Sequence, residues 1–352
     1  MKKRFLATVM TAGLVLGMTA CGGSQTQSTT ATETTKAADS SEAADTKGSE
    51  AASSQAAAST WKPTTTVSIV VPAGAGGNTD LSARVFAEYA KKMTGADFIV
   101  VNASGAAGSV AANQVRSAAA DGHTFLYGHN LVNVANIAGV TDYNYTAFKL
   151  GPTFALDPAQ QLYANPEKYK TLDEFIQAAK ANPGKLKVCT EVGAYTYYEL
   201  LAFEKVAGID LDLVDVGSNS DKIAAMLSGQ VDLMPGAYIN CKDYLEAGQF
   251  VCLGAPTKER YELIKDIPTL TEQGIDLVYP NCEFSFYFPK DTSDDVIAWY
   301  DELVKNMTED PEVKEAIAKV EMMPYYLSSA DSEVNDDKIY NDIKQIADDL
   351  AK

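Results

Sequence analysis

Histidine and cysteine, which bind transition metals and often act in catalysis, are scarce in this chain of 352 residues. Its two histidines are His123 and His129, and its five cysteines include no Cys-x-x-Cys pair. Metal sites normally draw such residues together at short spacings, so the sequence gives no support for a metal or another cofactor. The Gly-x-Ser-x-Gly and His-Glu-x-x-His patterns are also missing, and no nucleophile lies at a fixed spacing from His129. We therefore predict that the protein is not an enzyme.

Positive charge is also scarce. Lysine and arginine together number 29 against 47 acidic residues, which gives a formal net charge of −18. Loss of residues 1–20, which carry Lys2, Lys3 and Arg4 but no acid, would take the charge to −21. A surface this acidic argues against nucleic acid and anionic lipid as partners. It does not exclude an anionic ligand, because a site can be locally positive within a negative protein.

The first twenty residues have the order of an export signal. The three basic residues at 2–4 precede an apolar run over 5–18 that is too short to span a bilayer, and small residues precede Cys21. Those small residues before a lone cysteine resemble the lipobox of bacterial lipoproteins, in which Cys21 would become the lipid-modified first residue. The alternative is an ordinary signal peptide with an incidental cysteine.

Residues 21–60 are rich in serine, threonine and alanine and contain no aromatic side chain. Such a segment cannot bury enough apolar surface to offset the entropy of ordering, so we predict a disordered tether. A coil of this length spans on the order of 35 Å. The tether would hold the following domain clear of a membrane and still close to it.

From residue 61 onward the chain alternates between strand and helix patterns. A β-branched run at 66–72 leads through a glycine-rich loop to a helical period at 81–93. The same order recurs with a strand at 98–101, a loop at 102–108 and a helix at 109–119, and a third strand follows at 124–127. This alternation predicts a parallel α/β sheet whose ligand-binding loops lie beyond the carboxyl ends of the strands.

A second α/β unit follows in the middle of the chain. The patterns predict strands at 186–190, 211–216, 231–234 and 250–253, and helices at 172–181, 197–207 and 221–228. Helical periods return at 296–307, 311–320 and 337–350. Two α/β lobes with facing strand-end loops would enclose a cleft.

The loop at 74–80 is the clearest candidate for ligand binding. Glycines let backbone N–H groups approach a ligand closely, and a helix start adds about half a positive charge. Together they form an anion site that needs no arginine or lysine, although a plain strand-to-helix turn remains the alternative. Arg84 lies one turn after Asp80, so we expect an intrahelical ion pair. Asp80 would stabilise the helix dipole or accept a hydrogen bond from a ligand group.

Other strand-end loops carry aromatic and imidazole side chains. His129 would line the cleft or be structural, and the second-lobe tyrosines would contact a ligand or pack the lobe: Tyr195, Tyr197, Tyr198 and Tyr238. We favour no structural disulfide among the four later cysteines, which are widely spaced: Cys189, Cys241, Cys252 and Cys282.

Six short motifs occur in order along the chain. They are PAGAGGNTD (72–80), NASGAAG (102–108), AADGHTFL (119–126), LSGQVD (227–232), IPTLTEQG (267–274) and DPEV (310–313). Their order and spacing resemble the solute-binding proteins of tripartite tricarboxylate transporters, the Bug or TctC-like family. The first motif has one residue more between its proline and its glycine pair than the family pattern, and Ala107 stands where the family usually has glycine.

The resemblance implies an α/β, two-lobed fold of the type II periplasmic-binding-protein kind, which closes like a flytrap on a small carboxylate. Lobe 1 would comprise residues 61–162 and 286–352, and lobe 2 residues 163–285. The first two loops would grip a carboxylate through backbone groups and waters. The partners would be the large and small integral membrane subunits of a transporter driven by an ion gradient. The binding protein would be an extracytoplasmic, lipid-anchored monomer.

The candidate ligand-binding residues come from the strand-end loops of both lobes. Those of lobe 1 are Ala73, Gly76, Gly77, Asn78, Thr79, Asp80, Gly105, Ala106, Ala107, Gly128 and His129. Those of lobe 2 are Glu191, Gly193, Ala194, Tyr195, Ser218, Asn219 and Tyr238. The family often has small or hydroxyl residues where the tyrosines occur here, which suggests a different range of ligands or stacking on a ligand ring.

We therefore predict a protein that captures a small organic acid in the cleft and delivers it to a membrane transporter. Two alternatives stay open on the sequence. One is a lipoprotein that reports the ligand to a sensor kinase, and the other is a tethered hydrolase-like enzyme.

Overall fold

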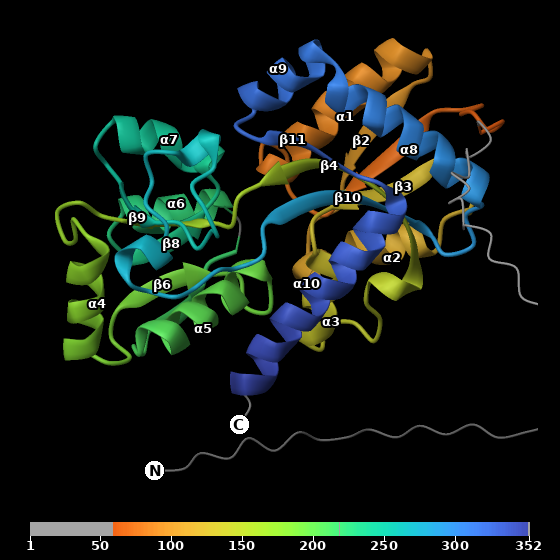
Figure 1. The fold of residues 1–352 in the computed structure, drawn as a ribbon. Coiled ribbons are helices and arrows are strands. Elements are labelled where there is room, and N and C mark those ends of the chain that lie inside the picture. Colours follow the sequence, from red (N-terminus) through yellow and green to blue (C-terminus); the bar gives the residue numbers. More distant parts are fainter. Residues whose placement is uncertain (1–58, 218, 351–352) are drawn as a thin grey trace, which may run out of the picture. The chain divides into compact units, whose positions relative to one another are not determined.

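The computed structural model describes residues 59–217 and 219–350. The predicted signal peptide, Cys21 and the tether up to residue 58 lie outside the described residues. The described part forms a six-stranded sheet, ordered β11-β4-β10-β3-β1-β2, and a five-stranded sheet, ordered β7-β6-β8-β5-β9 (Figure 1). We call each sheet with its helices lobe 1 and lobe 2, respectively. The predicted two-lobed α/β fold is confirmed.

Lobe 1 contains the three strands predicted first. β1 (Val67–Val71) pairs in parallel with β2 (Phe98–Asn102) and with β3 (Thr124–Gly128). The sheet as a whole is mixed, because β10 (Cys282–Pro289) runs antiparallel to β3 and to β4 (Phe148–Asp157), and β11 (Met323–Leu327) runs antiparallel to β4. The prediction of a parallel sheet was therefore only partly right. Parallel neighbours need a crossover connection, and β10 enters this sheet from lobe 2 without one.

The two faces of the lobe 1 sheet are covered by different helices. Helices α1 (Asn78–Thr94), α8 (Asp294–Glu309) and α9 (Pro311–Lys319) lie on one face (Figure 1). The other face carries α2 (Ser109–Arg116), α3 (Leu131–Ile137) and α10 (Ser329–Leu350). Strand side chains alternate between the faces, so Ile69 packs in one apolar cluster with Phe86 and its neighbour Val70 packs in another with Val115.

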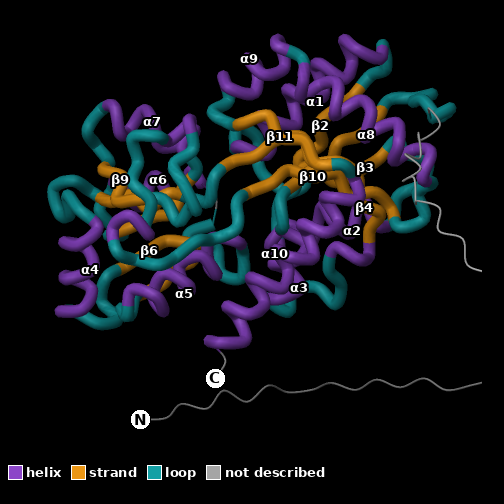
Figure 2. Tube along the Cα trace, viewed as in Figure 1, coloured by secondary structure: helices purple, strands orange, loops and turns teal. Residues whose placement is uncertain are grey.

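Lobe 2 is built in the same way. β6 (Lys187–Thr190) pairs in parallel with β7 (Asp212–Asp215) and β8 (Leu233–Gly236), whereas β5 (Gln161–Ala164) runs antiparallel to β8 and β9 (Val251–Gly254). On one face Val188 shares a cluster with residues of α4 (Leu172–Ala181) and α5 (Tyr195–Ala207). On the other face Cys189 shares a cluster with residues of α6 (Asn219–Leu227) and α7 (Tyr238–Glu246). Figure 2 shows α6 and α7 on the opposite side of this sheet from α5.

The chain passes between the sheets twice, from β4 to β5 and from β9 to β10. Each receiving strand begins a few residues before the lobe boundary expected from the sequence, at Gln161 and at Cys282. Short 3-10 turns at Glu262–Ile264 and Thr271–Gln273 lie on the second passage. Further short turns lie at Ala106–Gly108 and Tyr145–Ala147 in lobe 1.

The described part of the chain begins against lobe 1. Trp61 packs on Trp299 and Tyr300, with ring centroids 5.1 and 5.7 Å apart. A Cβ atom at Gly122 would lie 2.6 Å from the Trp61 ring, so this turn accepts only glycine without rearrangement. Thr60, which we assigned to the tether, donates through its N–H to Asp295 at 3.0 Å.

The four cysteines beyond the signal are free thiols, and all but Cys252 are buried. Cys189, Cys241 and Cys252 belong to lobe 2, and Cys282 begins strand β10 of lobe 1.

Candidate functional site

The glycine-rich loop joins β1 to α1, as the sequence predicted. Gly77 is the N-cap of α1 and no side chain caps the helix. Among the described residues, the backbone N–H groups of Gly77 and Asn78 have no hydrogen-bond partner. Unsatisfied N–H groups at the start of a 17-residue helix form a positive end that favours an anion.

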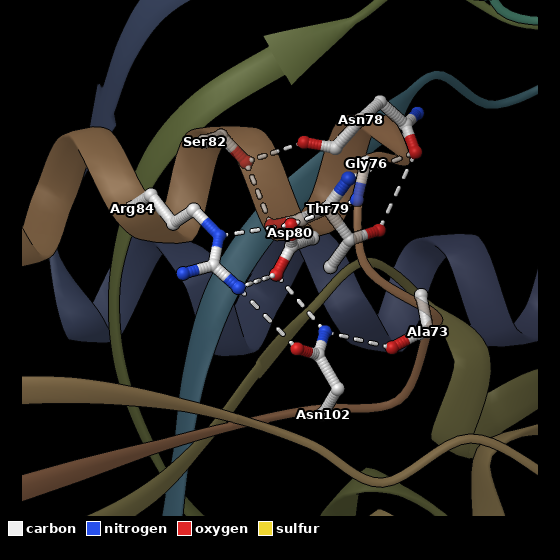
Figure 3. A network of polar contacts seen from close by, with 8 residues as sticks. All are labelled: Ala73, Gly76, Asn78, Thr79, Asp80, Ser82, Arg84 and Asn102. Carbon is white, nitrogen blue, oxygen red and sulfur yellow. Dashed lines mark hydrogen bonds and ion pairs between the residues drawn. The ribbon is translucent and has the colours of Figure 1, made fainter.

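Asp80 organises this loop from within (Figure 3). The residue is 1% exposed, and its Oδ1 accepts hydrogen bonds from Arg84 Nη2 and Asn102 Nδ2, both at 2.9 Å. Its Oδ2 accepts from the Gly76 N–H at 2.9 Å and from Arg84 Nε at 3.0 Å. Burial raises the pKa of the carboxyl, but the bonds from Arg84, Gly76 and Asn102 outweigh it and leave the pKa below its usual value. Asp80 is therefore an ionised carboxylate with its acceptor sites filled, and the expected ion pair with Arg84 is confirmed.

Asn102 ties the first two loops together. Its Nδ2 donates to the backbone oxygen of Ala73 at 2.9 Å as well as to Asp80 (Figure 3). In the second loop, residues 102–108, four consecutive residues have a positive φ. The values are 124° at Gly105, 46° at Ala106, 50° at Ala107 and 84° at Gly108. The two alanines are strained there, because a Cβ atom disfavours the left-handed region.

A buried acid that the sequence analysis missed anchors the start of α1. Asp157, at the end of β4, is fully buried, and its Oδ2 accepts from Asn78 Nδ2 at 2.7 Å. Its Oδ1 has no partner among the described residues. Burial raises the pKa of Asp157 to about 7, although the hydrogen bond from Asn78 and the nearby Gln160 side chain oppose this. Nothing local in the sequence marks this acid, because its burial comes from strands far apart in the chain.

His129 brings the end of β3 into contact with lobe 2. Its ring packs edge-on against Tyr195 and Phe284, with centroids 5.4 and 5.5 Å apart. Burial lowers the pKa of His129, which favours a neutral imidazole, and its Nδ1 lies 2.9 Å from Asn130 Oδ1. Tyr195 is itself buried and donates its hydroxyl hydrogen to the Pro280 carbonyl oxygen. In this structure His129 and Tyr195 pack the junction of the lobes.

The remaining lobe 2 candidates follow the carboxyl ends of β6, β7 and β8. Glu191 and Gly193 lie between β6 and α5, and Ala194 is the N-cap of α5. Asn219 opens α6 and donates from Nδ2 to Asn240 Oδ1 at 3.3 Å, while Tyr238 opens α7. Ser218 lies outside the described residues.

A buried lysine, which the sequence analysis also missed, lies beneath these loops. Lys222, in the first turn of α6, is 5% exposed and donates from Nζ to Thr196 Oγ1 at 3.3 Å. From the sequence alone, a lysine in a helix is expected to be exposed to solvent. Only the packing of α6 against the sheet shows that Lys222 is buried.

Comparison with known proteins identifies the family. Residues 82–348 match the model of TctC, the tripartite tricarboxylate transporter family receptor. The chain belongs to this family. A relative of this TctC-family chain from Cupriavidus necator, the UPF0065 protein in the gbd 5′ region, is 30% identical over 276 residues, which cover 76% of this chain and 82% of the relative.

Solved structures share the fold of this TctC-family chain. The Rhodopseudomonas palustris protein Rpa4515 with adipate aligns with a TM-score of 0.75 and 22% identity, over 81% of this chain and 97% of that one. MatC from the same organism, with bound malate, aligns with a TM-score of 0.73 and 23% identity, over 81% and 100%. Family members are solute-binding receptors rather than enzymes, and this chain is one of them. None of the helices in the described residues has the length and apolar character that a membrane span requires.

Proposed function

We propose that this receptor captures a small organic acid between its two lobes and delivers it to the membrane subunits of a tripartite transporter. The observation that carries the proposal is the start of α1, where free N–H groups of Gly77 and Asn78 meet a helix end without a side-chain cap. The loop needs no ligand to hold its shape, because Asp80 binds Gly76, Arg84 and Asn102 together. A preformed positive cradle suits a carboxylate.

The solved relatives support a carboxylate as the ligand. Malate and adipate, found in the two R. palustris proteins, are both carboxylates. The family's place in tripartite transporters supports a large and a small integral membrane subunit as partners. In this proposal the protein is an extracytoplasmic monomer, held near those subunits by a lipid on Cys21 and by the tether.

Titration calorimetry against aliphatic mono-, di- and tricarboxylates would test ligand capture. We expect at least one of these acids to bind, and mass spectrometry of the purified protein to recover a carboxylate unchanged. Absence of binding across the panel, or conversion of a bound acid to a product, would refute the proposal.

A pair of variants at Asn78 would test the role of the loop. Proline is tolerated at the first position of a helix, so Asn78→Pro removes one free N–H group, whereas Asn78→Ala removes the side chain and keeps that group. Both variants lose the bond to Asp157, so the difference between them isolates the N–H donor. We expect Asn78→Pro to bind about tenfold more weakly than Asn78→Ala. Equal binding by the two variants would show that this N–H group does not hold the ligand.

The anchor can be tested separately. Cys21→Ser should move the protein from the membrane fraction to the soluble extracytoplasmic fraction and abolish incorporation of a labelled fatty acid. Unchanged fractionation would show that Cys21 is an incidental cysteine.

A further inference from the structure

Lobe 2 contains a buried lysine that no carboxylate contacts among the described residues. Lys222 is 5% exposed, and its Nζ donates to the Thr196 hydroxyl at 3.3 Å. No ion pair joins it to a carboxylate within the described ranges. An ammonium group has three hydrogen-bond donors, and burying it without a counter-ion costs free energy. A lysine amine in this position therefore needs a further hydrogen-bond acceptor, preferably an anion.

Lys222 lies at the carboxyl end of strand β6 in the lobe 2 sheet. The chain leaves β6 through α5 to reach β7 on one side, and then returns through α6 to β8 on the other side. Helices α5 and α6 therefore lie on opposite faces, and the bond from Lys222 to Thr196 crosses the carboxyl end of β6. Thr190, the last residue of β6, has its Oγ1 2.9 Å from Thr196 Oγ1. In open α/β sheets ligands bind outside the carboxyl ends of the strands, where the strand order reverses.

The start of α5 adds a second source of positive potential at the same point. This 13-residue helix begins after Ala194, and no side chain caps it. Thr196 is its second residue, so the Lys222 ammonium lies beside the first turn. A helix start and a lysine together attract an anion more strongly than either does alone.

Glu199 is the alternative partner for Lys222. It lies one turn along α5, is 1% exposed, and neither of its carboxyl oxygens has a hydrogen-bond partner among the described residues. Burial raises the pKa of Glu199 well above its usual value, so the side chain is favoured in its neutral, protonated form. Burial also lowers the pKa of Lys222, and Cys189, Glu191 and Asp215 raise it only through space. No carboxylate among the described residues contacts this amine, so its charged form calls for an anion from outside the lobe.

The loop after β6 also contacts lobe 1. Tyr195 packs on His129, and a Cβ atom at Gly193 would lie 3.2 Å from the Cβ of Ala138, at the end of α3. The loops that follow β3 and β6 thus lie close together, and α5 starts directly after the second of them.

We propose that Lys222, with the start of α5, binds the second carboxylate of a dicarboxylate whose first carboxylate lies at the start of α1. Lys222 is then the residue that selects dicarboxylates over monocarboxylates of the same length. This inference rests on the proposed function, because it assumes that a carboxylate occupies the cleft.

The test compares ligands that differ only by one terminal carboxylate. Calorimetry would measure the affinities for adipate and hexanoate, and for succinate and butyrate, in the wild type and in Lys222→Met. We expect the wild type to prefer the diacid of the binding pair by on the order of 10- to 100-fold, and Lys222→Met to lose this preference while still binding the monoacid. Lys180→Met, an exposed lysine change on α4, is the matched control and should keep the wild-type preference.

A second pair of variants separates ligand binding from a structural role. If Lys222 acted only as the counter-ion of Glu199, the Lys222→Met and Glu199→Gln variants would each be destabilised and the preference would persist in both. We expect Glu199→Gln to keep the preference. The Lys222→Met/Glu199→Gln double variant removes both buried ionisable groups and should also lose the preference. It replaces Lys222→Met in the test if that single variant does not fold.

The outcomes are distinct. Persistence of the diacid preference in Lys222→Met or the double variant would overturn the inference, and so would equal affinity of the wild type for diacids and monoacids. In both cases the proposed carboxylate capture would stand. Absence of any carboxylate binding would overturn both proposals together.

Discussion

At the scale of single residues, the polar groups that matter most are the buried ones. Asp80, Asp157 and Lys222 each lie at the beginning of a helix or the end of a strand, and each is less exposed than its residue type usually is. Asp80 is fully hydrogen bonded and fixes the loop, whereas Asp157 and Lys222 have unused bonding capacity. A buried polar group with an unfilled hydrogen-bonding position indicates function more strongly than burial alone does, because proteins pair nearly all of their buried polar groups.

Asp157 gives a prediction about pH. The unfolded chain loses this proton near pH 4, whereas the folded protein holds it until about pH 7, so the folded state carries the extra proton between these values. The contribution of Asp157 to the free energy of unfolding therefore falls as the pH rises from about 4 to about 7, by on the order of 4 kcal/mol at most, and is constant above. Asp157→Asn should reduce this fall, measured by urea denaturation at pH 5 and pH 8.

Other acids contribute to the same fall in stability. Burial raises the pKa of Asp336 and of Glu283 to about 7 and that of Glu199 well above its usual value, so Asp157→Asn should remove only part of the fall. Asp291→Asn, at an exposed position, is the matched control and should leave the pH dependence unchanged. An identical pH dependence in Asp157→Asn and the wild type would contradict the prediction.

Ala107 gives a prediction about backbone strain. Its φ of 50° lies in the left-handed region, which costs an alanine about 1 kcal/mol and a glycine almost nothing. Ala107→Gly should therefore raise the free energy of unfolding by about 1 kcal/mol. Ala103→Gly, at a loop residue without a positive φ, should lower it by about 0.5–1 kcal/mol. A loss of stability in both variants, measured by urea denaturation, would show that the loop is not strained at Ala107.

At the scale of helices and strands, local patterns predicted much of the chain. Helix α4 was predicted with its observed bounds, and β1, β2 and β3 within a residue or two, because apolar periodicity and turn residues mark them directly. β4 was missed because it is buried along almost its whole length and therefore shows no alternation, and it includes Gly151 and Pro152. β10 and β11 were missed because their pairing partners are distant in the sequence, and α3 because it has only seven residues.

In the candidate site, too, local features could be predicted and features that depend on distant residues could not. The glycine loop and its ion pair could be predicted, since the glycines and the Asp80–Arg84 spacing are local features. The roles of Asp157 and Lys222 could not, because an acid at a strand end and a lysine in a helix gain their meaning from burial by distant residues. His129 and Tyr195 were singled out from their loops, but only the fold shows that they contact each other across the lobes.

Helix α1 offers two ion pairs of identical spacing for comparison. Asp80–Arg84 and Glu88–Lys92 are both four residues apart, but the Asp80 side chain is 2% exposed and that of Glu88 is 62% exposed. Asp80→Asn should lower the free energy of unfolding by about 2 kcal/mol, because buried hydrogen bonds to a charge are weakened, and it should weaken carboxylate binding. Glu88→Gln, the matched control, should change neither quantity measurably. Equal effects of the two changes on urea denaturation would contradict the assigned role of Asp80.

At the scale of the whole described chain, the two sheets share one apolar core. A single cluster of buried side chains includes Phe154 and Phe284 of lobe 1 as well as Leu162 and Leu253 of lobe 2. Helix α10 adds to this link, since Ile339 and Ile343 belong to the cluster and Asp349 pairs with Lys205 of α5 at 2.8 Å. A core shared in this way couples the stability of the two lobes.

The residue types that are rare in this chain allow that coupling to be measured without inserted probes. Both tryptophans, Trp61 and Trp299, pack against lobe 1, whereas Cys189 and Cys241 are buried in lobe 2. Tryptophan fluorescence in a urea series therefore follows lobe 1, and thiol labelling of the Cys189 and Cys241 peptides, read by mass spectrometry, follows lobe 2. Because one core joins the sheets, we expect the two midpoints to coincide and to rise together when a carboxylate binds. Labelling of the lobe 2 thiols at a clearly lower urea concentration than the fluorescence change would show that the lobes unfold independently.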